Sequence, residues 1–170
     1  MFDALFTTTT EYKKLSHALS GKGACALFGL PASGRAQVYA ALCRQLDKPL
    51  CIVTPGEAEA TRFAADLNTL GIPTAVFPAR DYVLRPIEGT AREYEYRRLA
   101  VLGELVGGRL RAVAVPAEAL TQFTTPKEDF CANTRTLHAG DTLLRDDLLA
   151  ALFGAGYTRR AQVDGPGQFS

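Results

Sequence analysis

The sequence predicts an α/β fold in which crossover helices connect the strands of a parallel sheet. Three observations support this prediction. Short apolar runs with β-branched or aromatic members recur, a segment with helical periodicity follows each run, and glycine or proline separates them. Residues 1–124 keep this rhythm, whereas residues 125–170 depart from it after the stretch TTPKE. We therefore expect an α/β subdomain over 1–124 and the start of a smaller α+β domain over 125–170.

Turn residues set the ends of the elements in the larger part. Gly21 and Gly71 each follow a helical pattern, and Thr90 would cap a long helix through a capping box with Glu93. In chain order, we expect a helix over Glu11–Leu19, a strand over Ala24–Phe28, a helix over Arg35–Leu46, a strand over Leu50–Thr54, a helix over Glu57–Leu70, a strand over Thr74–Phe77, a surface loop over Pro78–Gly89, a helix over Ala91–Leu105, a strand over Leu110–Val115 and a short helix over Pro116–Phe123.

The smaller part has a weaker pattern. We expect a strand over Thr134–His138, a helix over Leu143–Phe153 that ends at Gly154, a strand over Tyr157–Val163, and an irregular end over Gly165–Ser170. A βαβ piece of this size cannot close its own core, because below about 40 to 60 residues independent folding is marginal. The sequence is therefore expected to stop inside a domain.

Composition excludes several classes of protein. The chain carries 19 Lys+Arg against 18 Asp+Glu, and a net charge of +1 creates no global field for nucleic acid or an anionic membrane. No apolar run approaches the length of a membrane span, so we expect a cytoplasmic protein without a membrane partner. The cysteines, which form no CxxC motif and lie in apolar stretches, are expected to be reduced and to act as small hydrophobic residues: Cys25, Cys43, Cys51 and Cys131.

The segment GLPASGRA, Gly29–Ala36, has the GxxxxG spacing of a phosphate-binding loop. Arg35 and Ala36 stand where such a loop has lysine and then serine or threonine, and alanine offers no oxygen to Mg²⁺. Two interpretations stay open: a tight strand-to-helix turn, or a degenerate phosphate loop made by Gly29, Ser33, Gly34, Arg35 and Ala36. Both argue against a competent NTPase site. His17 and His138 have no partner spacing, so no metal is expected.

Arginine is concentrated in two places. Seven arginines lie between Arg80 and Arg111, interleaved with five acidic residues. This segment is either a nucleic-acid patch or, as we favour, a solvated helix face with ion pairs. Arg159 and Arg160 follow Tyr157 in the last expected strand. The pair is either edge-strand charge or a docking surface for an acidic partner.

The order of motifs resembles a known family. The stretches ALFGLPASGRA, FPARDYVLRPIEG, YRRLAVLGEL, AVAVPAEAL and GYTRRAQVDGPGQFS follow one another as in the N-terminal region of the bacterial transcription-repair coupling factor (Mfd). That region is similar to part of the excision-repair protein UvrB. The resemblance covers nearly the whole chain. It implies a P-loop, helicase-like subdomain with a degenerate Walker A loop, followed by a truncated domain of the type that binds UvrA.

The resemblance also implies a function. It predicts a non-catalytic module that recruits UvrA to stalled RNA polymerase in nucleotide excision repair, with Arg159 as the main UvrA contact and Arg160 as a lesser one. No cofactor is expected in this stretch. In the full-length family, an ATP-dependent DNA translocase, ATP and Mg²⁺ act in motor domains, and RNA polymerase and DNA are bound by parts that lie beyond these 170 residues. A weak nucleotide-binding P-loop domain and a DNA-binding module are the alternatives.

Overall fold

The computed structural model describes residues 7–21, 24–46, 48–80 and 93–170. The chain divides into two compact units, Met1–Gln122 and Phe123–Ser170, which we call unit 1 and unit 2. Among the described residues, unit 1 holds a three-stranded sheet and unit 2 a two-stranded sheet, and all strand pairs in both are parallel. The predicted α/β class with a parallel sheet is therefore confirmed.

The sheet of unit 1 is built around its most apolar strand. Its strands are β1 (Leu50–Thr54), β2 (Thr74–Val76) and β3 (Ala112–Pro116), in the order β1-β3-β2. All residues of β3 are buried, as expected for a central parallel strand that is covered on both faces. Leu50 lies opposite Ala112, and Thr54 lies opposite Pro116.

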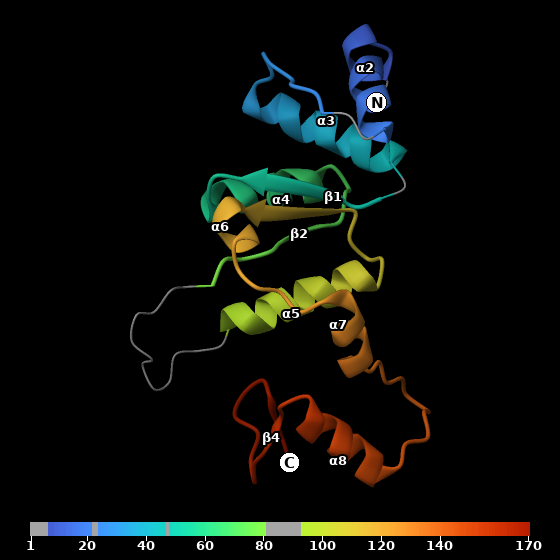
Figure 1. Ribbon diagram of the computed structural model, residues 1–170, viewed down its shortest axis with the longest axis vertical. Coiled ribbons are helices and arrows are strands. Elements are labelled where there is room, and N and C mark those ends of the chain that lie inside the picture. Colours follow the sequence, from blue (N-terminus) through green and yellow to red (C-terminus); the bar gives the residue numbers. More distant parts are fainter. Residues whose placement is uncertain (1–6, 22–23, 47, 81–92) are drawn as a thin grey trace. The chain divides into compact units, whose positions relative to one another are not determined.

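Helices cover both faces of this sheet. Figure 1 shows α3 and α4 on one side and α5 on the other. An N-terminal helix, α2, packs against α3, and its first turn is capped by the Thr9 hydroxyl, which accepts a hydrogen bond from the Tyr12 amide at 3.2 Å. The described helices of unit 1 are α2 (Thr10–Ser20), α3 (Ala32–Gln45), α4 (Glu57–Thr69), α5 (Glu93–Val106) and α6 (Ala117–Leu120).

The alternation of side chains along the strands creates a core on each face. On one face, Ile52 and Ala112 pack with Cys43 of α3 and Leu67 of α4. On the other face, Val113 and Val115 pack with Phe77 and with residues of α5 and α6. Burying one large aliphatic side chain contributes about 1.5 to 3 kcal/mol, so these clusters stabilise unit 1.

Unit 2 is built differently. Its elements are α7 (Lys127–Asn133), α8 (Arg145–Gly154), β4 (Thr158–Arg159) and β5 (Gln168–Phe169). All of its residues are described, and none of them is buried. The rings of Phe153 and Phe169 meet edge to face, with centroids 5.1 Å apart. Short strand pairing, local hydrogen bonds and this aromatic contact contribute to holding the unit together.

Three predictions for unit 1 are wrong. Residues 24–28 form no strand and are exposed. Helix α3 begins at Ala32, because Pro31 is preorganised to start a helix, so the second half of the GxxxxG motif is helical. Pro116 ends β3, and the helix that follows stops at Leu120. The proposed Thr90 capping box and most of the Pro78–Gly89 loop lie outside the described residues.

Unit 2 departs further from expectation. Residues 134–138 are exposed and form no strand, because nothing in unit 2 pairs with them. The predicted strand over Tyr157–Val163 shortens to β4. Helix α7 and strand β5 were not predicted. The start of α7 has a recognisable signal, since Pro126 precedes Glu128 and Asp129 in the first helical turn.

The cysteines follow the prediction only in part. All four are free thiols, but only Cys43 is buried. Burial raises the pKa of the Cys43 thiol, which the nearby cations of Arg111 and Arg44 oppose. Cys25, Cys51 and Cys131 are exposed, so among the four cysteines only Cys43 is buried as a small hydrophobic residue. In the described part of the chain, no helix is long and apolar enough to cross a membrane.

Candidate functional site

The glycine-rich segment Gly29–Ala36 runs into the first turns of α3, which begins at Ala32. Gly29 has a φ of 83°, which suits glycine, and it precedes Pro31 at the N-cap of α3. Gly34 and Ala36 are buried in the helix, and a Cβ atom at Gly34 would lie 3.3 Å from the ring of Pro31. A hydroxyl at position 36 would therefore face the protein interior, where Ala36 is 2% exposed.

Two of the five residues considered for a degenerate phosphate loop border a cavity. Gly29 and Arg35 line a groove of about 550 Å³ with residues of α2, α3 and β1, whereas Ser33 lies outside it. Most of the other lining residues are apolar: Leu15, Leu19, Cys25, Leu27, Phe28, Leu30, Val38, Tyr39, Leu42, Leu50, Cys51, Ile52 and Val53. We call this cavity the β1 groove. One arginine in an apolar groove does not suit a triphosphate, which requires several donors.

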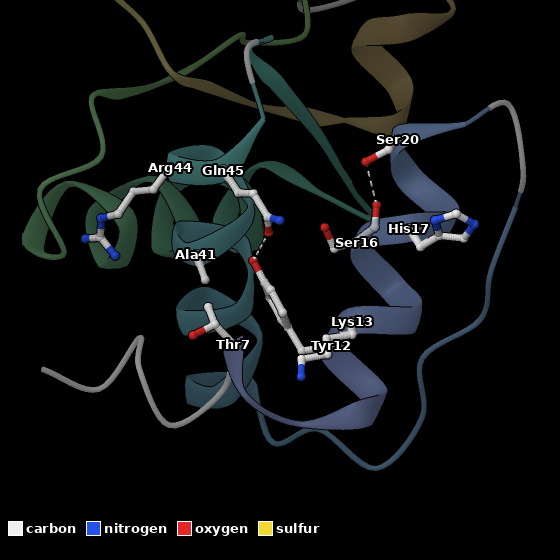
Figure 2. A pocket seen from close by; sticks show the side chains of 9 residues that line it. All are labelled: Thr7, Tyr12, Lys13, Ser16, His17, Ser20, Ala41, Arg44 and Gln45. Carbon is white, nitrogen blue, oxygen red and sulfur yellow. Dashed lines mark hydrogen bonds between the residues drawn. The ribbon is translucent and has the colours of Figure 1, made fainter.

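A second cavity, of about 530 Å³, lies between α2 and α3 (Figure 2). The Tyr12 hydroxyl donates to Gln45 Oε1 at 2.9 Å across it, and the Ser20 hydroxyl donates to the Ser16 carbonyl at 2.8 Å. Arg44 also lines this cavity, but its guanidinium points away and donates to the Leu70 carbonyl. The bond from Tyr12 to Gln45 joins the two helices, the bond from Ser20 to Ser16 lies within α2, and the arginine charge is directed elsewhere.

One arginine of the Arg80–Arg111 segment lies in the core. Arg98 is 3% exposed, and its guanidinium carbon lies 4.1 Å from the centroid of the Phe77 ring. Its Nη1 atom donates to the Pro78 carbonyl at 2.9 Å and to Gln122 Oε1 at 3.1 Å. Burial lowers the pKa of Arg98, and the cation of Arg80 lowers it further. Arginine stays charged even so.

Gln122 completes this arrangement at the end of unit 1. Its Oε1 accepts from the Arg80 amide at 2.7 Å, and its Nε2 donates to the Arg80 carbonyl at 3.0 Å. We call Arg98, Gln122 and the backbone of residues 78–80 the Arg98 clamp. It joins the motifs FPAR and YRRL and the turn that follows α6, which are far apart in sequence. The prediction of a solvated arginine face is therefore wrong for Arg98, since charge counting does not reveal which arginine is buried.

The arginine pair of unit 2 lies on a fixed backbone. The Thr158 amide donates to the Gly167 carbonyl at 2.9 Å, and the Arg160 amide donates to the Phe169 carbonyl at 2.8 Å. Arg159 lies between these bonds, opposite Phe169. Both arginines are exposed, and no ion pair between described residues includes either of them.

The structure therefore brings together two motifs that the sequence separates. GYTRR and PGQF form the two strands of one small sheet, and Phe169 packs on Phe153 of α8. Arg159 is the last residue of β4 and Arg160 follows it directly, so side-chain alternation along an extended chain would turn the two arginines to different sides. The arrangement can present one guanidinium to a carboxylate through paired N–H donors. Sequence analysis identified both arginines but missed the strand that fixes them.

Comparisons with known proteins point to one relative. The chain is 27% identical over 146 residues to the transcription-repair-coupling factor of Bacillus subtilis (strain 168). The matched stretch covers 85% of this chain but only 12% of that protein. No protein-family model matches the chain. The predicted resemblance is confirmed: the chain is related to the transcription-repair-coupling factor, and it spans a small part of the length of that relative.

Proposed function

We propose that this chain is a non-catalytic recruitment module of transcription-repair coupling, and that unit 2 docks on UvrA through Arg159. The observation that carries the proposal is the exposed Arg159 on a strand whose backbone is already paired. Such preorganisation lowers the entropic cost of binding. The relation to a transcription-repair-coupling factor supports the general role.

The complementary chemistry is an acidic surface on UvrA. A guanidinium that has no ion pair among the described residues loses only its hydration when a carboxylate binds it, and charge-assisted hydrogen bonds at such a contact are worth about 1.5 to 3 kcal/mol. Arg160 follows β4 directly, and because successive residues of an extended chain turn to opposite sides, we expect it to contribute less in this arrangement. Unit 1 then acts as a scaffold. DNA and RNA polymerase are contacted by other parts of a longer protein, where ATP and Mg²⁺ act.

Two features of the glycine-rich segment support the absence of catalysis in this chain. Ala36 is buried and has no oxygen for a metal. Arg35 borders a groove lined mainly by apolar side chains. Mg²⁺-ATP should therefore leave the melting temperature of the chain unchanged, because only a ligand that binds the folded state shifts it.

Isothermal titration of UvrA into the chain tests the proposal. The variants are Arg159→Glu, Arg160→Glu and, as a matched control, Arg135→Glu, which makes the same charge change at another exposed position of unit 2. We expect Arg159→Glu to weaken binding by tenfold or more, Arg160→Glu to weaken it less, and Arg135→Glu to leave it nearly unchanged. Equal binding by wild type and Arg159→Glu would contradict the assignment, and so would equal losses in all three variants, because these would indicate a nonspecific charge effect.

A further inference from the structure

We propose that residues 24–28 act as a strap that closes on the free edge of β1 and becomes a fourth parallel strand of the unit 1 sheet. This inference concerns unit 1 and is independent of the proposed UvrA contact. The strap, ACALF, is apolar throughout and has no strand partner. Its last residues are strongly exposed, with Leu27 at 46% and Phe28 at 88%. Exposed apolar side chains of this size favour a buried position.

The acceptor is the outer edge of β1. Among the described residues, β1 pairs only with β3, so its other edge presents unpaired amides and carbonyls. The strand LCIVT has no charge and no proline to protect that edge. Cys51 and Val53 share a face with Val113 and Val115 of β3, yet Cys51 is exposed and Val53 is 53% exposed. The edge therefore has both hydrogen-bonding groups and apolar surface to offer.

The β1 groove brings the strap and the acceptor together. Cys25, Leu27 and Phe28 border the same cavity of about 550 Å³ as Leu50–Val53 of β1. Gly29 follows the strap with a φ of 83°, so the chain can change direction there without the strain that a side chain would cause. The strap is tethered to the site it would fill, which makes closure an intramolecular step.

Crossover handedness places the strap on this edge. Helix α4 connects β1 to β2 across one face of the sheet, and α3 lies on that same face, because Cys43 and Leu67 share one core cluster. Connections between parallel strands are right-handed in nearly all proteins. If the strap–α3–β1 connection has the same hand as β1–α4–β2, the strap must lie on the side of β1 away from β3. That side is the free edge.

The equal lengths of the strap and β1 suggest their register. Pairing Ala24 with Leu50 and Phe28 with Thr54 uses every residue of β1. Cys25 then lies beside Cys51 on the face of the sheet where Val53 is exposed. Ala24, Ala26 and Phe28 turn to the face covered by α3, with the two small alanines beside Leu50 and Ile52 and the larger Phe28 at the end of the strap beside Thr54. Residues in this register have Cα atoms within the range that a disulfide can span.

Thiol cross-linking in the 170-residue chain tests the strap, in a Cys131→Ser background that removes the exposed thiol of unit 2. Copper phenanthroline removes two electrons and two protons from a thiol pair that comes into contact, and peptide mass mapping identifies the disulfide. The matched variant moves the thiol by one residue to the other face of the strap, as Cys25→Ser with Ala26→Cys. We expect the 25–51 disulfide to form at least tenfold faster than a 26–51 disulfide. Equal rates for the two pairs, or no disulfide in either, would overturn the proposal.

Hydrogen exchange supplies a readout that does not depend on cysteine. Closure predicts slowed exchange of the strap amides, and Val53→Lys, a charge at an exposed position of the acceptor edge, should reverse the slowing by tenfold or more. The amides of β3 should stay equally protected in both proteins, which shows that unit 1 remains folded. Strap amides that exchange at the rate of a free peptide in the wild-type chain would contradict closure.

Discussion

Unit 1 and unit 2 are stabilised in different ways. Among its described residues, unit 1 has four buried clusters, distributed over both faces of its sheet and against α2. Unit 2 has no buried residue, and its strands are two residues long. The stability of the first therefore depends on burial, whereas the second depends on local hydrogen bonds and one aromatic contact. This difference separates substitutions that change folding from substitutions that change only binding.

The largest effect on stability is expected in the core of unit 1. Leu67 is fully buried between α4, α3 and the sheet. Leu67→Ala should lower the free energy of unfolding by about 2 to 5 kcal/mol, because it leaves a cavity as well as removing apolar contacts. Urea denaturation followed by circular dichroism measures the loss. The matched change in unit 2, Leu148→Ala at a half-buried position, should cost about 1 kcal/mol or less. Equal losses would remove the contrast between the units.

The Arg98 clamp is expected to contribute the next largest effect. Arg98→Met keeps the length of the side chain but loses its hydrogen bonds to Pro78 and Gln122. We expect a loss of about 1.5 to 3 kcal/mol, the usual value for hydrogen bonds to a charged group. Arg97→Met, at the exposed neighbouring position, is the control and should cost about 1 kcal/mol or less, the usual value of an exposed cation–π contact such as the one Arg97 makes with Tyr94. If thermal unfolding shows the two variants to be equally stable, the clamp is not a stabilising contact.

Thiol reactivity compares the units without any substitution. Burial raises the pKa of the Cys43 thiol. Partial desolvation also raises the pKa of the Cys51 thiol, although Cys51 is exposed. A raised pKa means less thiolate at pH 8, and thiolate is the form that reacts with iodoacetamide. Mass spectrometry should find Cys131 of unit 2 alkylated at least tenfold faster than Cys43 of unit 1. Rapid alkylation of Cys43 would show that unit 1 opens readily. Because folding raises the pKa of the Cys43 thiol, this group contributes stability below its unfolded pKa. That contribution is lost as pH rises from the unfolded pKa through the folded pKa.

The smallest effect is expected in unit 2. Phe169→Ala removes the contact with Phe153, and edge-to-face ring pairs contribute about 0.5 to 1.5 kcal/mol. We expect faster hydrogen exchange at the Thr158 and Arg160 amides, which bond to β5, and no change in unit 1. A loss of the overall unfolding transition would contradict the view that unit 2 adds little to the stability of unit 1.

Sequence analysis predicted unit 1 better than unit 2, for a physical reason. In unit 1, β1 was predicted with its observed ends, and α4 within one residue, because burial imposes a pattern of apolar residues on them. The run at residues 24–28 has the same pattern but no partner in the sheet, so pattern alone predicted a strand that is not formed. A strand is a property of a pair, and a single segment does not reveal its partner.

The candidate site divides in the same way. Arg159 and Arg160 were identified by their residue type and position, but the pairing with Gln168 and Phe169 depends on a contact between separated segments. The buried position of Arg98 was missed, because an arginine beside tyrosines and acids looks like surface charge. Its partners are a backbone carbonyl and an amide side chain, neither of which leaves a charge pattern in the sequence.

Hydrogen exchange of the chain with and without UvrA tests the central claim most directly, because it reads both units in one experiment. The account predicts that UvrA slows exchange in unit 2, above all at the amides of Tyr157–Arg160 and Gln168–Phe169, and leaves the amides of β1 and β3 unchanged. Protection confined to unit 1, with unit 2 exchanging as in the free chain, would contradict the account and would place the docking surface on the α/β unit.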